Sequence, residues 1–332
     1  MADSDGESLY EGKEYIPMDE KLDKWADVEP IEQYTQENDP GVCKIDYTPG
    51  FEEAMRYFRA LLNSNEISRR MLELTQVVIK VNYGCYTAWY IRRKCLDEIG
   101  TEEDWQNEIK YLNKIGIALE KNYQIWHHRR CIVQKLNDPS NEKQFMEGIL
   151  KSDDKNYHAW SYRIWFIKYF NLFDGEMEFI EKMIQDNPVN NSAWSYRYFL
   201  VNHTKEFGKE TVEQEIQYAF QQIKDYKLDN EAPWVYIRGF LAKTDEEAKR
   251  SQRPNSSAKR IIITDFPFVK ETCLQMLKDY EEGAHGYRFI NILLLDYLIG
   301  EGLKEEANEV IDKLATVYDP IRENYWKYRK IS

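Results

Sequence analysis

Apolar side chains recur at helical spacing along most of this chain. In residues 51–66, Phe51, Met55, Phe58 and Leu62 are separated by three or four positions, which places them on one face of a helix. Apolar residues with the same spacing follow in many later segments, and clusters of turn-forming residues separate these segments. The pattern predicts a protein made of amphipathic helices joined by short turns.

A tryptophan motif repeats at intervals close to 34 residues. Five tryptophans are separated by 37, 34, 34 and 40 residues: Trp89, Trp126, Trp160, Trp194 and Trp234. Four of them follow an asparagine by four residues: Asn122, Asn156, Asn190 and Asn230. Each precedes an arginine by three or four residues: Arg92, Arg129, Arg163, Arg197 and Arg238. A fixed period of this length indicates a repeat protein.

Each motif predicts the start of a helix. Asparagine is a favourable N-cap, because its side chain accepts a hydrogen bond from a free N–H group of the first turn. The tryptophan then lies at the fourth helical position and points inward, and the arginine lies on the same face one turn later. There the arginine can stack on an aromatic ring or pair with a carboxylate of a neighbouring helix. All three residue types are therefore interpreted as structural. In the first repeat Cys85 replaces the asparagine, which weakens the predicted cap.

Second helices are predicted between the tryptophan helices, for example around Phe145 and Ile149. A unit of two antiparallel helices cannot bury its apolar face alone, so successive units must stack. We therefore expect an all-α fold, a right-handed superhelix (solenoid) of antiparallel helical hairpins. The tryptophan motif is no longer regular after Trp234. The polar and basic residues 244–260 are interpreted as a long connecting loop. Trp326 marks a partial repeat near the end of the chain.

The beginning of the chain differs from the rest in charge. Residues 1–50 contain 14 acidic residues and four lysines, so they account for −10 of the net charge of −13. We expect residues 1–45 to be an acidic, largely disordered arm, in which a short stretch around Ile31–Tyr34 docks on the body. Residues 46–332 are expected to form the helical-repeat domain.

Several classes of protein are disfavoured by composition. The body is nearly neutral, which argues against a nucleic-acid binder and against recruitment to anionic membranes. No stretch approaches 18 apolar residues, and the N-terminus lacks the features of a signal peptide. The five cysteines form no CxxC pair, no cluster has metal-ligand spacing, and the adjacent His127 and His128 point about 100° apart on a helix. We therefore expect a cytoplasmic protein without a metal site of its own, in which these two histidines are packing or interface residues.

The residues inside the repeats carry a family resemblance. The segments KNYQIWHHRR (121–130) and KNYHAWSYR (155–163) resemble adjacent repeats of protein prenyltransferase alpha subunits. The closest resemblance is to the subunit shared by protein farnesyltransferase and geranylgeranyltransferase type I. NNSAWSYRYF (190–199) and IRENYWKYR (321–329) are also similar to it, and the resemblance extends from about residue 20 to the end. The pattern of tetratricopeptide repeats is absent. The alpha subunit of Rab geranylgeranyltransferase shares the repeat and is a second interpretation within the family.

The resemblance implies one half of a heterodimeric enzyme. Such enzymes transfer a farnesyl or geranylgeranyl group from its diphosphate to the cysteine of a C-terminal CaaX motif. The beta subunit, rather than this chain, would hold the catalytic zinc and the isoprenoid pocket, and magnesium is a further ion expected with the diphosphate. Zinc lowers the pKa of the substrate thiol, and the departing diphosphate needs cationic donors. The choice between farnesyl and geranylgeranyl would be made in the beta subunit.

Site residues follow from the resemblance. Lys121 would contact the diphosphate and assist its departure, with Tyr157 and His158 as further catalytic residues. Gln124 would bind the carboxylate of the CaaX peptide, and Tyr86 would line the site.

Local physical chemistry agrees with the position of Lys121 and leaves one alternative open. Lys121 and Lys155 each precede an asparagine cap, so each ammonium lies beside a helix N-terminus, which attracts anions. Lys155 is interpreted as structural or interfacial.

The alternative for the whole chain is a non-catalytic helical-repeat scaffold that binds a protein in its groove. A scaffold would have no reason to combine Lys, Gln, Tyr and His at consecutive helix starts.

Overall fold

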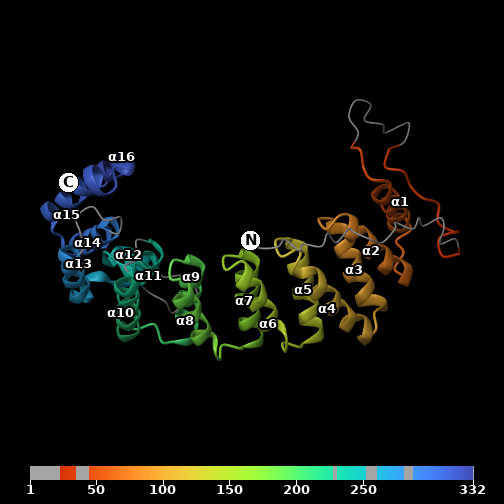
Figure 1. Ribbon diagram of the computed structural model, residues 1–332, viewed down its shortest axis with the longest axis horizontal. Coiled ribbons are helices and arrows are strands. Elements are labelled where there is room, and N and C mark those ends of the chain that lie inside the picture. Colours follow the sequence, from red (N-terminus) through yellow and green to blue (C-terminus); the bar gives the residue numbers. More distant parts are fainter. Residues whose placement is uncertain (1–22, 35–44, 227–229, 252–259, 280–286, 332) are drawn as a thin grey trace, which may run out of the picture. The chain divides into compact units, whose positions relative to one another are not determined.

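The computed structural model describes residues 23–34, 45–226, 230–251, 260–279 and 287–331. The chain divides into two compact units. The first unit is Met1–Ser152 with Asn156–Tyr162, and the second is Asp153–Lys155 with Arg163–Ser332. Within each unit, helices that follow one another in the chain lie side by side (Figure 1). The predicted all-α class of helical hairpins is confirmed, with one pair of two-residue strands among the described residues.

The first unit contains α1 (Pro49–Asn63), α2 (Arg69–Val81), α3 (Tyr86–Ile99), α4 (Glu102–Gly116), α5 (Tyr123–Leu136), α6 (Glu142–Ser152) and the first turns of α7 (Tyr157–Phe170). The second unit contains the rest of α7, then α8 (Glu176–Asp186), α9 (Asn191–Thr204), α10 (Lys209–Tyr226), α11 (Ala232–Phe240), β1 (Leu241–Ala242), α12 (Asp245–Ser251), β2 (Ile261–Ile262), η2 (Ile263–Asp265), α13 (Pro267–Asp279), α14 (Tyr287–Glu301), α15 (Lys304–Lys313), η3 (Leu314–Tyr318), η4 (Pro320–Arg322) and α16 (Glu323–Tyr328).

The repeat asparagines cap their helices as predicted. The side chain of Asn122 accepts hydrogen bonds from the N–H groups of Gln124 and Ile125, at 2.9 and 3.2 Å. Asn156 and Asn190 accept equivalent bonds at the starts of α7 and α9. These bonds satisfy N–H groups that have no partner inside the helix.

Two of the predicted caps differ from this pattern. Cys85 gives α3 no side-chain cap, as the sequence suggested. Helix α11 begins one residue later than the motif predicts, so that Glu231 is its N-cap, while Asn230 still accepts a hydrogen bond from the N–H of Ala232 at 2.9 Å. The predicted cap at Asn230 is therefore wrong in position, although the asparagine keeps a similar bond.

Three of the four repeat asparagines also bind the repeat before them. The Nδ2 of Asn122 donates to the carbonyl of Tyr83 at 3.1 Å, and the indole N–H of Trp89 donates to the same carbonyl at 2.9 Å. The same arrangement recurs one repeat later on the carbonyl of Glu120, with Trp126 and Asn156 as donors. One carbonyl oxygen in the turn thus joins the tryptophan of one repeat to the asparagine of the next.

Four of the five repeat arginines form buried ion pairs with glutamates of the following helix. The same glutamate also accepts a hydrogen bond from a tyrosine or histidine two residues after the next repeat's tryptophan. The four triads are Arg92–Glu108–His128, Arg129–Glu142–Tyr162, Arg163–Glu176–Tyr196 and Arg197–Glu215–Tyr236. All twelve side chains are buried. Each carboxylate therefore binds two consecutive repeats together.

The arginines also stack on aromatic rings. The guanidinium carbon of Arg129 lies 3.5 Å from the ring centre of Phe145, and that of Arg163 lies 3.6 Å from Phe179. Both contacts predicted for the arginines, the aromatic ring and the carboxylate, are confirmed. Burial alone would raise the pKa of Glu108, but the hydrogen bonds from its histidine and arginine lower that pKa to about 2. The carboxylate in this triad is therefore ionised at neutral pH.

Part of the N-terminal arm packs on the first two helices. Trp25 is buried and meets the ring of Tyr57 edge-on, with the ring centres 5.4 Å apart. Arg70 of α2 forms two hydrogen bonds with the carboxylate of Asp27, at 2.6 and 3.0 Å. The packed stretch thus begins before the predicted Ile31–Tyr34. Most of the predicted arm lies outside the described residues, so the division at residues 45 and 46 stays a prediction.

The predicted connecting loop at residues 244–260 contains a helix. Residues Asp245–Ser251 form α12, and residues 252–259 lie outside the described parts. Strands β1 and β2 flank this segment and pair in parallel, with Leu241 opposite Ile261. The interpretation of the whole segment as a loop is therefore wrong, because the acidic first turn and basic last turn of α12 suit a helix.

We predict that Glu176→Ala destabilises the protein by about 3–5 kcal/mol, because it leaves the buried guanidinium of Arg163 without its carboxylate. Urea unfolding followed by circular dichroism measures this loss. Glu178→Ala is the matched control, since Glu178 is an exposed carboxylate on the same helix. Equal unfolding midpoints for the two variants would contradict a role of the triad in stability.

Candidate functional site

The three predicted catalytic residues lie at the starts of two consecutive repeat helices. Lys121 directly precedes the cap of α5 and is exposed. Tyr157 and His158 are the first two residues of α7. Because asparagine caps fix both helix starts, the residues beside the caps have defined positions. All of these residues belong to the first unit.

His158 is held among three aromatic rings. Its ring meets that of Tyr123 at 89°, with the centres 4.3 Å apart. The ring of Trp126 is nearly parallel to it, at 13° and 6.2 Å, and that of Tyr157 lies 5.5 Å away. Two of these rings come from the preceding repeat. The imidazole therefore has a fixed place between the two helix starts.

His158 is also linked to Lys121. Burial lowers the pKa of His158 below its ordinary value, and a hydrogen bond with the backbone of Lys121 partly opposes this shift. The imidazole is therefore neutral at neutral pH in the free chain. Lys121 directly precedes the N-cap of α5, and the helix dipole favours negative charge at this end of the helix. Together these groups form a place suited to an oxyanion.

Exposed tyrosines mark the same position in three repeats. Tyr86, Tyr123 and Tyr157 are each the first residue of their helix and are 71%, 67% and 67% exposed. Large exposed aromatic side chains are common where a protein binds a partner. Tyr123 was not among the site residues predicted from the sequence. Its equivalence to Tyr86 and Tyr157 within the repeat was the signal that could have found it.

The structure does not join all predicted site residues into one cluster. Gln124 is half-buried, and its backbone N–H donates to the side chain of Asn122. Within the described part of the chain, neither the side chain of Gln124 nor Tyr86 forms a hydrogen bond or ring contact with His158. Their predicted roles depend on where a bound peptide lies and stay predictions.

The described residues show no candidate metal site. No three His, Cys, Asp or Glu side chains among them are placed to hold a metal ion. The residues present therefore do not fit a zinc centre. Among the same residues, no helix is long and apolar enough to cross a membrane.

Comparison with known proteins identifies the family. Residues 105–136, 139–170 and 173–204 match the family model described as "Protein prenyltransferase alpha subunit repeat". A protein of Dictyostelium discoideum is 34% identical over 330 residues, which cover 96% of this chain and 95% of the relative. That relative is named protein farnesyltransferase/geranylgeranyltransferase type-1 subunit alpha. This chain belongs to the protein prenyltransferase alpha-subunit family.

Two further comparisons agree with membership in the prenyltransferase alpha-subunit family. A Pisum sativum protein with the same name is 32% identical over 316 residues, which cover 92% of each chain. A solved structure of Candida albicans protein geranylgeranyltransferase-I, complexed with GGPP, is similar with a TM-score of 0.75 and 29% identity. The similarity covers 96% of this chain and 98% of the C. albicans chain. The resemblance inferred from the repeat interiors is thereby confirmed.

We predict that His158 titrates below its ordinary pKa of about 6.5, because burial disfavours the charged imidazolium. The neutral imidazole of His158 then contributes to stability above the ordinary pKa. This contribution is lost as the pH falls through the lowered pKa of the folded protein. NMR titration of the imidazole carbons measures the midpoint, and the signal missing from His158→Gln gives the assignment. A midpoint at or above the ordinary value would contradict the burial of the ring.

Proposed function

We propose that this chain is the alpha subunit of a heterodimeric CaaX protein prenyltransferase. The enzyme would transfer a farnesyl or geranylgeranyl group from its diphosphate to the cysteine of a C-terminal CaaX motif. Membership in the alpha-subunit family supports this proposal, as does the name of the full-length Dictyostelium relative. The observation that carries it is the hydrogen bond between His158 and the backbone of Lys121, which joins two consecutive helix starts.

In the proposed reaction, a bond forms between the cysteine sulfur and C1 of the isoprenoid. The bond between C1 and the diphosphate oxygen breaks, and the diphosphate leaves with the electron pair. Negative charge therefore develops on the leaving group, and fixed cationic donors near it stabilise the transition state. Lys121 supplies such a donor from this chain. Zinc bound by the beta subunit would lower the pKa of the thiol, with magnesium as a further ion on the diphosphate.

His158 and the tyrosines would complete the diphosphate contact. A neutral imidazole that already bonds the backbone of Lys121 gains a second donor only when it takes up a proton. Bound diphosphate would favour that proton uptake, because a nearby negative charge raises the pKa of a histidine. The hydroxyl of Tyr157 offers a further donor at the same helix start. Gln124 would bind the peptide carboxylate, and Tyr86 would line the site from the preceding repeat.

The beta subunit is the expected partner, and the cytoplasm is the expected location. A non-catalytic scaffold is the alternative function. The two proposals differ in what Lys121 does, since a scaffold has no chemical step for it to accelerate. They also differ in whether any activity depends on association with a beta subunit.

We predict that Lys121→Ala in the heterodimer slows the single-turnover rate by roughly 100-fold, because it removes one cationic donor from the leaving group. Binding of the isoprenyl diphosphate should weaken much less, since most of the contact surface stays. Rapid-quench kinetics measures the rate, and fluorescence titration measures the affinity. The control is Lys114→Ala, which removes an exposed lysine from α4. An unchanged single-turnover rate would remove Lys121 from its proposed role.

We predict that the purified chain alone transfers no isoprenoid, because the described residues hold no metal-ligand cluster to activate a thiol. Activity should appear when the chain is expressed together with its beta subunit. Transfer of tritiated isoprenoid to a CaaX peptide measures both. Robust turnover by the monomer would overturn the subunit assignment. An active beta subunit whose turnover needs no alpha chain would favour the scaffold alternative.

A further inference from the structure

The fifth repeat arginine departs from the rule of the other four. Arg92, Arg129, Arg163 and Arg197 are buried against glutamates 13 to 18 residues later in the chain. The side chain of Arg238 is 37% exposed and bonds to Asp296 of α14, through Nε alone, at 2.7 Å. Its two terminal nitrogens have no hydrogen-bond partner among the described residues. Arg238 therefore differs from the other four repeat arginines in being partly exposed and only partly bonded.

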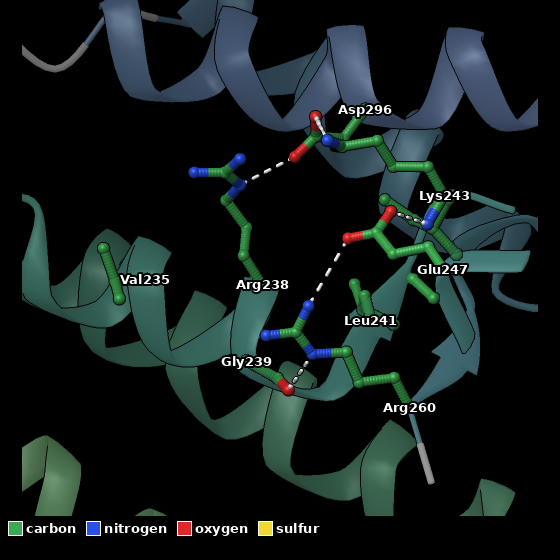
Figure 2. A pocket seen from close by; sticks show the side chains of 10 residues that line it. Val235, Arg238, Gly239, Leu241, Lys243, Glu247, Arg260 and Asp296 are labelled. Atoms are coloured by element: carbon green, nitrogen blue, oxygen red, sulfur yellow. Dashed lines mark hydrogen bonds and ion pairs between the residues drawn. The ribbon is translucent and has the colours of Figure 1, made fainter. Parts of the chain in front are cut away.

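Arg238 lines a pocket of about 250 Å³ in the second unit. Figure 2 shows two further cations around the same hollow, Lys243 and Arg260, together with the carboxylates of Glu247 and Asp296. Lys243 Nζ lies 3.4 Å from Asp296, and Arg260 Nη1 lies 3.4 Å from Glu247. Three cations therefore face two carboxylates, in a chain whose net charge is −13.

The backbone fixes these cations in place. Lys243 follows β1 and Arg260 precedes β2, so in this parallel pair they lie at opposite ends of two short strands, and both line the pocket. Arg260 Nε donates to the carbonyl of Gly239 at 3.2 Å. Helix α14 approaches the same place so closely that a Cβ on Gly300 would lie 3.0 Å from the carbonyl of Lys243. This approach holds Asp296 beside the pocket.

Hydrogen-bond donors remain available on all three cations. Arg238 has both terminal nitrogens, and Arg260 has its second terminal nitrogen, which has no partner in the described chain. Lys243 Nζ makes one long contact although an ammonium carries three donors. The carboxylates bond only part of each cation and keep it oriented. Forked guanidinium groups with free donors match the oxygens of a phosphate group, which carries close to two negative charges at neutral pH.

We propose that this pocket binds a phosphate group, either free phosphate or a phosphate monoester on a peptide. The site is separate from the residues assigned to prenyl transfer and does not depend on that function. Its occupation would join α11, the β1–β2 pair and α14 through one anion.

Isothermal titration of the full-length chain with inorganic phosphate, at constant ionic strength, tests this proposal. We expect saturable binding that Lys243→Gln and Arg260→Gln each weaken by about tenfold, since each removes a charged hydrogen-bond donor. Arg250→Gln is the control, because Arg250 is 84% exposed on α12 and does not line the pocket. Arg238 is left intact because Asp296 is buried and pairs with it.

A second titration uses a capped phosphoserine peptide and separates the two sources of phosphate. Tighter binding of the peptide supports a phosphorylated protein as the source, and tighter binding of inorganic phosphate supports the free ion. Absence of saturable binding of either ligand overturns the proposal. Equal affinities of Arg260→Gln and Arg250→Gln overturn it as well. Lys121→Ala distinguishes this pocket from the transfer site. If Lys121→Ala loses phosphate binding and Arg260→Gln keeps it, the anion binds at the helix starts and the pocket proposal is overturned.

Discussion

The buried contact between an arginine, a glutamate and the tyrosine or histidine of the next repeat is the interaction on which the structure depends. A buried carboxylate without partners is costly, so each glutamate requires both neighbours in place. In the triad of Glu142, the arginine comes from one repeat and Tyr162 from the next. The carboxylate can be satisfied only when the two repeats are stacked in one register. Hydrophobic burial favours stacking in general, and the triads select the register within each unit.

The register of the stacked repeats determines where the helix starts lie, and therefore where the residues proposed for catalysis lie. The turn carbonyls add a second constraint, because each accepts from the tryptophan of its own repeat and from the asparagine of the next. His128 occupies the place that tyrosine holds in the other triads. A tyrosine could also donate to Glu108, but the second nitrogen of the histidine lies 3.5 Å from Arg93 of α3. The residues proposed for catalysis lie outside these contacts, so they can differ between repeats without loss of the fold.

The sequence revealed the parts of this arrangement that recur at a constant spacing. The Asn-to-Trp and Trp-to-Arg distances are set by one helix, so they repeat and could be recognised. The glutamates could not, because a turn of variable length separates them from their arginines and a lone glutamate on a polar helix looks like a surface residue. The partner of Arg238 could not be recognised for a similar reason, since Asp296 lies 58 residues later in the chain. Lys121 and His158 were predicted as site residues from the family resemblance, and their roles stay predictions, whereas the ring contacts of Tyr123 required the structure.

The repeat also explains why one lysine is a candidate for chemistry and its counterpart is not. Lys121 and Lys155 occupy the same position before an asparagine cap, so the local sequence and the helix dipole do not separate them. The difference lies one repeat further along the chain. His158 is the second residue of α7 and meets Lys121, whereas the second residue of α9 is Ser192. A serine at that position cannot supply an imidazole, so an imidazole bonds the backbone at Lys121 and does not at Lys155. The proposed function therefore depends on a pair of neighbouring repeats, because the helix start at Lys121 is completed by His158 of the next repeat.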